Sequence, residues 1–265
     1  MTRTAVVTGS ASGIGAATKR ALEADGFRVF GIDLRGADLD ADLGSAEGRA
    51  LAIKQATDFC GGTLDALVPC AGLSGLPDRP GSLLASVNYF GTVDLILGLK
   101  TALQASGEAS VVAISSNSTT IQPGVPMAVV DACLNHDEEL ARSAADAASS
   151  LASYPATKTA IAWWIRSQAV DPSWVDHGVH LNALAPGMIE TAMVAEGRAD
   201  ATIGKFFDLL PIPRGRMGRP EEVAALIALL CSPLGRNFVG SILSIDGGTD
   251  ALLRTQDWPK PMSTS

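Results

Sequence analysis

The stretch Thr8-Gly9-Ser10-Ala11-Ser12-Gly13-Ile14-Gly15 lies close to the N-terminus and decides the fold. It joins a short apolar segment, Thr4–Thr8, to a helix-like segment, Gly13–Asp25, which predicts a strand, a tight turn and a helix. Glycines in such a turn let a ligand approach the backbone, and the free N–H groups at the start of the helix suit a phosphate. We therefore predict a dinucleotide-binding turn, with contacts from Gly9, Ser12, Gly13, Ile14 and Gly15.

The alternation of strand-like and helix-like segments continues along the chain. Five further segments are short and almost continuously apolar, and we predict them as strands: Arg28–Asp33, Leu64–Cys70, Ser110–Ser115, His180–Leu184 and Ser241–Ile245. Four more helices are predicted between them: Ser45–Phe59, Leu83–Ala105, Ala156–Val170 and Pro220–Cys231. Continuous apolarity is typical of strands buried on both faces of a parallel sheet. The sequence thus predicts an α/β fold with a doubly wound parallel sheet, in a single domain over residues 1–265.

One segment, residues 117–152, interrupts this alternation. A structureless connection of that length is unusual in a compact domain, and Asp137–Ser150 is rich in Ala, Glu and Arg. We predict a helical insertion that covers one face of the domain. Residues 255–265 contain prolines and show no periodicity, and they are predicted to be a tail.

Composition narrows the class of partner. The chain has 265 residues with 28 acidic against 20 basic side chains, a net charge of −8, which argues against nucleic-acid and membrane-surface binding. No signal peptide is expected before the first strand, and the longest apolar run, Val223–Cys231, is too short to span a bilayer. The four cysteines lack C-x-x-C spacing and the three histidines lack companions, so no metal site is expected. We expect a soluble cytoplasmic protein with reduced cysteines.

Asp33, at the end of the second predicted strand, bears on the choice of cofactor. A carboxylate there can bind both ribose hydroxyls of NAD and repels the 2′-phosphate of NADP. No Lys or Arg lies within Gly9–Gly15, whereas Arg35 is the opposing observation, because its side chain can turn toward a phosphate. The alternative is that Asp33 is simply a turn residue. We predict NAD.

Tyr154 and Lys158 are four residues apart, so on a helix they share one face. A free phenol has a pKa near 10. A neighbouring ammonium and the positive nicotinamide of the oxidised cofactor both favour its ionised form, so we expect Lys158 and the bound cofactor to lower the pKa of Tyr154. Ser115 and Ser116 end a predicted strand, where ligands bind in open α/β sheets. Asn88 lies in an otherwise apolar helix, and a buried amide needs partners, which a water relay to Lys158 would provide.

These elements together resemble the short-chain dehydrogenase/reductase family. The matching motifs occur in the family's order: Thr8–Gly15, Cys70-Ala71-Gly72, Asn88, Ser116, Tyr154 with Lys158, and Pro186-Gly187. The resemblance covers residues 3 to about 250 and implies a seven-stranded Rossmann fold and an oxidoreductase. It implies that Ser116 orients the substrate, Tyr154 is the general acid/base, Lys158 assists it and binds ribose, and Asn88 supports a proton relay.

The resemblance also implies further cofactor contacts. Asp42 and Leu43 match the pair that contacts adenine, and Ile189 and Thr191 match positions beside the nicotinamide carboxamide; Cys70, Ala71, Gly72, Pro186 and Gly187 complete the set, with Tyr154 and Lys158. There are two departures. The family's usual Asn-Asn-Ala-Gly is Pro69-Cys70-Ala71-Gly72 here, and the segment between Ser116 and Tyr154 is longer than usual. Because the first motif mainly stabilises the sheet, we expect catalysis to be retained.

Substrate and assembly follow from a closer resemblance. Short segments such as Ser86-Val87-Asn88-Tyr89-Phe90-Gly91, together with the long insertion, resemble the hydroxysteroid dehydrogenase/carbonyl reductase branch of this family. This implies NAD(H)-dependent interconversion of a secondary alcohol and a ketone on a hydrophobic substrate, a 3α-hydroxysteroid or related carbonyl compound, beneath a lid at residues 191–215. The alternatives are a dehydrogenase of terpenoid or other small cyclic alcohols and a non-catalytic NAD-binding sensor. The insertion favours a homodimer over a homotetramer.

Overall fold

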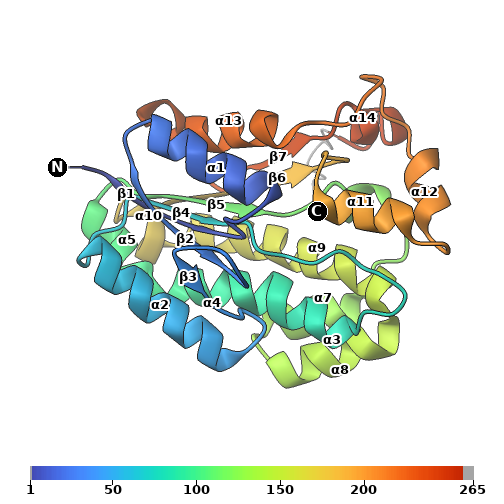
Figure 1. The fold of residues 1–265 in the computed structure, drawn as a ribbon, viewed down its shortest axis with the longest axis horizontal. Coiled ribbons are helices and arrows are strands. Elements are labelled where there is room, and N and C mark those ends of the chain that lie inside the picture. Colours follow the sequence, from blue (N-terminus) through green and yellow to red (C-terminus); the bar gives the residue numbers. More distant parts are fainter. Residues whose placement is uncertain (1, 259–265) are drawn as a thin grey trace, which may run out of the picture.

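The sheet predicted from the apolar segments has seven strands, all parallel, in the order β3-β2-β1-β4-β5-β6-β7 (Figure 1). The computed structural model describes residues 2–258 and places the strands at Thr4–Thr8, Arg28–Asp33, Leu39–Asp40, Ala66–Pro69, Ser110–Ile114, His180–Pro186 and Ile242–Ile245. Strand order reverses between β1 and β4, and ligands bind at such switch points in open α/β sheets. The predicted Rossmann-type single domain is confirmed.

Side chains alternate along each strand and pack into two separate apolar layers. Ala5 and Val7 of β1 belong to one layer, whose helices are α1 (Gly13–Ala24) and α13 (Pro220–Leu230). Val6 of the same strand belongs to the other layer. That layer is covered by α2 (Ala46–Cys60), α4 (Gly91–Gly98) and α9 (Ser150–Ala169). Figure 1 shows α1 and α13 together on one face of the sheet and α2, α4 and α9 on the other. Burial on both faces explains the continuous apolarity of the strands.

The prediction of a single helix over Leu83–Ala105 is wrong, because the segment is divided into four helical pieces. The segment forms α3 (Gly81–Leu84), a π-helix, η1 (Ala85–Phe90), then α4 and α5 (Lys100–Ser106). Glycines allow these pieces to pack closely, because a Cβ on Gly98 would lie 2.4 Å from Cδ1 of Ile53. A π-turn adds one residue to a helical turn, and apolar periodicity over a buried segment does not reveal it.

The insertion contains three helices, α6 (Ser118–Ile121), α7 (Met127–Leu134) and α8 (Glu138–Ala148). The helix predicted over Asp137–Ser150 is confirmed as α8, and the carboxylate of Asp137 caps it by accepting the N–H of Leu140 at 3.0 Å. The other two helices are too short to show a periodic pattern. Figure 1 shows α7 and α8 on the side of the sheet that carries α3 and α9, so the insertion thickens that layer.

Helix α9 begins at Ser150, earlier than the predicted start at Ala156, and includes Pro155. A proline has no N–H to donate to the carbonyl four residues back, here that of Leu151. The side-chain amide of Gln122, from the insertion, donates to this carbonyl at 3.4 Å. Because the helix continues through Pro155, Tyr154 and Lys158 lie on one helix.

The remaining helices are short: α10 (Pro172–Val175), α11 (Ala192–Ala199), α12 (Gly204–Leu209), a 3₁₀ turn at Pro233–Gly235, and α14 (Thr249–Leu253). No single helix within residues 2–258 is long and apolar enough to cross a membrane. One pair of consecutive helical segments, Gly81–Gly98 and Lys100–Ser106, is long and apolar enough when taken together, but it is bent by 53°. Of the predicted tail, residues 259–265 lie outside the described residues.

Candidate active site

The glycine-rich turn has a shape that only glycine can hold. Gly9 and Gly13 have φ values of +65° and +52°. A Cβ on Gly9 would lie 2.9 Å from the nitrogen of Ala71, and a Cβ on Gly15 would lie 2.0 Å from the carbonyl oxygen of Gly9. Ser12 is the N-cap of α1, yet its side chain makes no capping hydrogen bond. The start of α1, at Gly13 and Ile14, therefore offers free N–H groups and an exposed hydroxyl to an anionic ligand.

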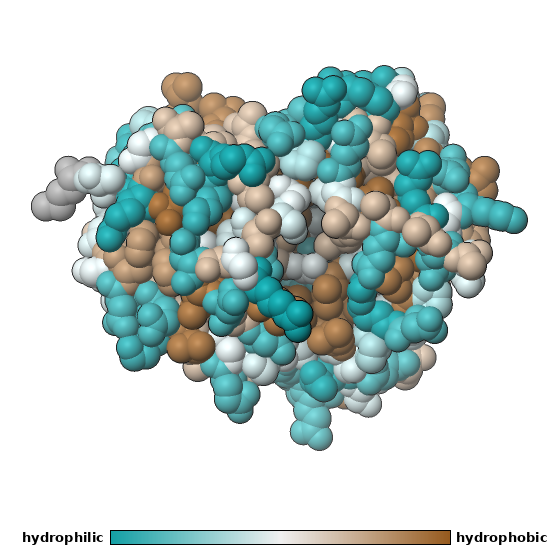
Figure 2. All heavy atoms as spheres, in the orientation of Figure 1, coloured by the Kyte–Doolittle hydropathy of each residue, from teal (hydrophilic) through white to brown (hydrophobic). Residues whose placement is uncertain are grey.

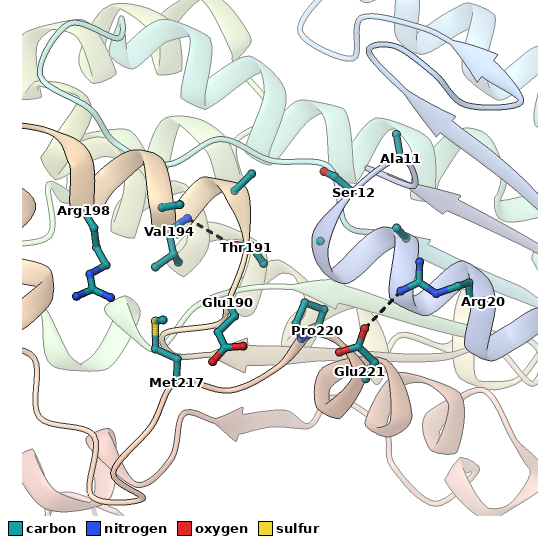
Figure 3. A pocket seen from close by; sticks show the side chains of 14 residues that line it. Ala11, Ser12, Arg20, Glu190, Thr191, Val194, Arg198, Met217, Pro220 and Glu221 are labelled. Atoms are coloured by element: carbon teal, nitrogen blue, oxygen red, sulfur yellow. Dashed lines mark hydrogen bonds and ion pairs between the residues drawn. The ribbon is translucent and has the colours of Figure 1, made fainter.

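A pocket of about 600 Å³ opens beside this turn, between the N-terminal ends of α1, α11 and α13 (Figure 3). Its lining includes Ser12, Gly13 and Thr191. Thr191 caps α11 by accepting the N–H of Val194 at 3.3 Å, and its methyl carbon would lie 3.2 Å from a Cβ on Gly13. Figure 2 shows a hollow in this face, where Figure 1 places the gap between α1 and α11. Three helix N-termini meet at this pocket, and the free N–H groups at such ends suit a pyrophosphate.

Asp33 stands at the end of β2, and backbone groups fix its carboxylate. Its oxygens accept the N–H of Ala11 at 2.9 Å and the N–H of Leu34 at 2.7 Å. A second carboxylate, Asp38, which the sequence did not single out, accepts from Nζ of Lys19 at 2.6 Å. Lys19 lies on α1 just past the glycine-rich turn, and this pairing neutralises the cation nearest that turn on the helix. The carboxylate of Asp33 therefore disfavours an added phosphate on the ribose, and the ion pair with Asp38 keeps Lys19 from attracting one.

Asp42 and Leu43, the pair predicted to contact adenine, follow the short strand β3. The carboxylate of Asp42 accepts the N–H of Gly44 at 2.9 Å. The side chain of Leu43 is buried in the core, and its carbonyl accepts from Arg49 at 3.3 Å. The side chain of Leu43 thus faces the core and is not available to a ligand, whereas Asp42 is exposed.

Asn88 lies in η1 and is fully buried. Its Oδ1 accepts the N–H of Leu73 at 2.7 Å, and its Nδ2 donates to the carbonyl of Leu73 at 3.0 Å and to Oγ1 of Thr157 at 3.2 Å. A Cβ on Gly72 would lie 3.2 Å from Oδ1 of Asn88 and 3.4 Å from Nζ of Lys158. The structure therefore brings Asn88 and Lys158 to the same point beside Gly72. Thr157, which completes the arrangement, was not predicted.

The catalytic candidates meet where β5 ends against α9. Nζ of Lys158 donates to the carbonyl of Ile114 at 2.9 Å and lies 5.9 Å from the centre of the Tyr154 ring. The side chain of Ser116 is near enough to the phenol of Tyr154 to lower its pKa. The neighbouring hydroxyl of Ser115 donates instead to the backbone carbonyl of Lys158 at 2.9 Å, so it holds α9 to the strand.

Burial controls the ionisation of this pair. It raises the pKa of Tyr154, and the neighbouring Ser116 only partly opposes that effect. Burial also lowers the pKa of Lys158 to about 8. In the protein without cofactor, desolvation thus decides the direction of the Tyr154 pKa, and the lowering by Lys158 and an oxidised nicotinamide stays a prediction for the cofactor-bound enzyme. The phenol is neutral near pH 7 and holds a proton that it can donate.

The other predicted contacts lie around the ends of neighbouring strands. Cys70 follows β4, and burial raises the pKa of its thiol to about 12, so a neutral group replaces the family's asparagine amide. Pro186 ends β6, and a Cβ on Gly187 would lie 2.6 Å from Cβ of Asp246. Ile189 is buried and forms an isolated bridge with Gly218. All of these residues lie along the carboxyl edge of the sheet.

Family models match most of the chain. One described as short chain dehydrogenase covers residues 3–129, and one described as enoyl-(acyl carrier protein) reductase covers residues 140–250. The chain is 37% identical over 253 residues to a 3-alpha-hydroxysteroid dehydrogenase/carbonyl reductase of Comamonas testosteroni, covering 94% of this chain and 97% of the relative. The chain belongs to the short-chain dehydrogenase/reductase family. It is accordingly an oxidoreductase that acts on CH–OH donors.

Two further comparisons cover nearly the whole of this short-chain dehydrogenase/reductase. A cis-4-hydroxycyclohexanecarboxylate dehydrogenase of Sinomonas cyclohexanicum is 34% identical, covering 94% of this chain and 97% of the relative. The crystal structure of a 3-alpha-hydroxysteroid dehydrogenase from Pseudomonas sp. B-0831 complexed with NADH superposes with a TM-score of 0.91 at 39% identity, covering 96% of this chain and 99% of that one. The predicted family and fold are confirmed.

The burial of Lys158 predicts a dependence of stability on pH. Its pKa is about 8 in the folded protein against the ordinary 10.5, so the unfolded chain binds more protons between these values and stability must rise with pH there. Relative to Lys158→Met, the cofactor-free protein should gain about 2 kcal/mol of unfolding free energy between pH 7 and pH 10. Urea unfolding at both pH values measures this gain. Lys54→Met, at an exposed site, is the control. The prediction is contradicted if the difference in unfolding free energy from the unmodified protein is independent of pH for both variants.

Proposed function

We propose that this protein is an NAD(H)-dependent enzyme that interconverts a secondary alcohol and a ketone. The observation that carries the proposal is the convergence of Ser116, Tyr154 and Lys158 at the end of β5, beside a turn shaped for a pyrophosphate. Asn88 extends this group through Gly72. A sensor that only binds the cofactor has no need of such a set, so the non-catalytic alternative gains no support.

The residues present fit NAD. The turn is packed so tightly that a Cβ on Gly9 or Gly15 would meet backbone atoms, which keeps its shape fixed, and Asp33 presents a fixed carboxylate where a ribose would lie. We propose that Ser12, Gly13 and Ile14 hold the pyrophosphate, that Ile189 and Thr191 lie beside the nicotinamide, and that the other predicted contacts complete the adenine and nicotinamide ends. When bound, NAD supplies the hydride acceptor, and NADH the hydride donor. The NADH-bound relative is consistent with this choice.

The side chains can supply the proton chemistry. In ketone reduction the neutral phenol of Tyr154 donates its proton to the substrate oxygen as negative charge develops there, and the hydroxyl of Ser116 hydrogen-bonds that oxygen. Lys158 stabilises the phenolate that remains, and the polar atoms of Asn88 and Lys158 beside Gly72 mark the route by which a proton returns from solvent. Alcohol oxidation reverses these transfers.

The substrate is proposed to be a hydrophobic 3α-hydroxysteroid or related ketone. The predicted lid contains α11 and α12, and the side chains of Phe206 and Leu209 on α12 are 67% and 76% exposed. Arg79, from the loop after β4, ties α11 down by donating to Glu196 at 3.1 and 3.3 Å. An apolar lid closed by an ion pair suits a bulky apolar substrate. The relative that acts on a hydroxycyclohexane acid supports the alternative of a small cyclic alcohol.

We also propose that the protein forms a homodimer. Three leucines near the C-terminal edge of the sheet are at least half exposed: Leu234, Leu252 and Leu253. The insertion covers η1 and α9 on the opposite side, which leaves less of that face for a second contact. Light scattering should give the mass of two chains, and a tetramer would contradict the proposal.

Replacing Tyr154 by Phe should remove the proton donor and leave the ring in place. We expect kcat to fall by about 100- to 10,000-fold, the usual contribution of general acid catalysis, with the Kd for NADH nearly unchanged. Steady-state rates and NADH fluorescence titration measure the two quantities. Tyr89→Phe is the matched control, because Tyr89 is the other of the two tyrosines and its buried hydroxyl has no hydrogen-bond partner within the described residues. Full activity of Tyr154→Phe would refute the assignment.

A substrate panel tests the proposed function as a whole. Steroids with a 3α-hydroxyl and small cyclic alcohols are each incubated with NAD and with NADP, and the appearance of reduced cofactor is followed by absorbance. We expect rapid turnover of the steroids with NAD, because Asp33 and Asp38 oppose the extra phosphate of NADP. Turnover of small alcohols alone would favour the alternative substrate. Equal rates with both cofactors would overturn the choice of NAD.

A further inference from the structure

Ser86 lies in η1 two residues before Asn88 and is fully buried. Its hydroxyl donates to Oε1 of Glu138 at 2.8 Å and accepts from Nη1 of Arg142 at 2.6 Å. Both partners belong to α8 of the insertion. The insertion therefore does more than cover η1, because it satisfies both hydrogen-bonding roles of a hydroxyl inside that π-helix.

Glu138 is itself fixed by a buried charge. Arg49, on α2, is 4% exposed and donates to both carboxylate oxygens of Glu138. Its Nε lies 2.7 Å from the carboxylate of Asp94 on α4, and Asp94 also faces His136 at 3.2 Å. Breaking one member of such a buried set leaves an unpaired charge, so the set holds its members rigidly. The carboxylate of Glu138 that contacts Ser86 is thus itself held in a fixed position.

The π-helical geometry of η1 explains why Ser86 needs these contacts. The N–H of Gly91 donates to the carbonyl of Ser86, five residues back, in place of the usual four. A π-turn is less favourable than an α-helical one and persists where other contacts stabilise it. The phase of the turn decides where Asn88 points, and Asn88 must reach both Leu73 and Thr157. Fixing Ser86 fixes the start of that turn.

We propose that Ser86, held by Glu138 and Arg142, is a positioning residue for Asn88, so that the insertion sets the geometry of the proton relay. This inference rests on the proposed function, in which Asn88 takes part in proton return. It assigns a catalytic consequence to a segment that packs on the outside of the domain, far along the chain from the cofactor turn.

The test uses Ser86→Ala and Arg142→Met in the full chain. We expect kcat to fall about tenfold in Ser86→Ala and by less in Arg142→Met, with the Kd for NADH changed less than twofold. The pH at which kcat titrates should shift in both variants in the direction seen for Asn88→Ala. Glu139→Gln removes one charge from the same turn of α8 at an exposed position, and it should leave kcat and its pH profile unchanged.

Combining Ser86→Ala with Asn88→Ala separates the possible failures. If Ser86 acts through Asn88, the double variant should be no slower than Asn88→Ala alone. If Asn88→Ala lowers kcat and Ser86→Ala and Arg142→Met do not, the positioning role is overturned and the proposed function stands. If Asn88→Ala leaves kcat and its pH profile unchanged, the relay itself is wrong and Ser86 has nothing to position. Additive losses in the double variant would show a general structural effect and would also overturn the proposal. Arg142→Met keeps the aliphatic stem of an exposed side chain, so it remains informative if Ser86→Ala does not fold.

Discussion

The buried ammonium of Lys158 imposes the central constraint on this molecule. A buried charge is costly unless it has hydrogen-bonding partners, and the carbonyl of Ile114 at the end of β5 supplies one. That bond, with the one from Ser115 to the carbonyl of Lys158, ties α9 to the central sheet. Tyr154 and Ser116 then meet as a consequence, because each is carried by one side of the same junction. The order of the strands places this junction next to the glycine-rich turn.

The sequence was informative where structure depends on neighbours along the chain. The apolar strands, the glycine-rich turn and the spacing of Tyr154 and Lys158 are local patterns, and they located six of the seven strands. The short strand β3 offers no apolar run and was implied only by the family resemblance. The π-helix, Thr157 beside Asn88, and the charge set around Arg49 depend on contacts between distant segments. No periodicity or spacing in one sequence reports such contacts, and the burial that raises the pKa of Tyr154 in the cofactor-free protein could not be predicted for the same reason.

Electrostatics divide the cofactor site into two ends. Around the turn, helix N-termini and unpaired N–H groups provide positive potential for a pyrophosphate. Beyond β2, Asp33 provides negative charge, and Asp38 neutralises Lys19. The same surface therefore attracts one phosphorylated group and rejects another, over a short length of chain. Net acidity is compatible with nucleotide binding because the attraction is local.

The contact between Gln122 and the carbonyl of Leu151 has a consequence for how such enzymes can be shortened. Pro155 leaves a gap in the backbone ladder of the helix that carries the active-site tyrosine, and a side chain from the insertion fills it. An engineer who trimmed residues 117–152 to the length of a more compact homologue would remove that partner and keep the proline. The trimmed enzyme would leave the carbonyl of Leu151 to water, so a change in its stability would report the loss of this contact as well as the shorter loop.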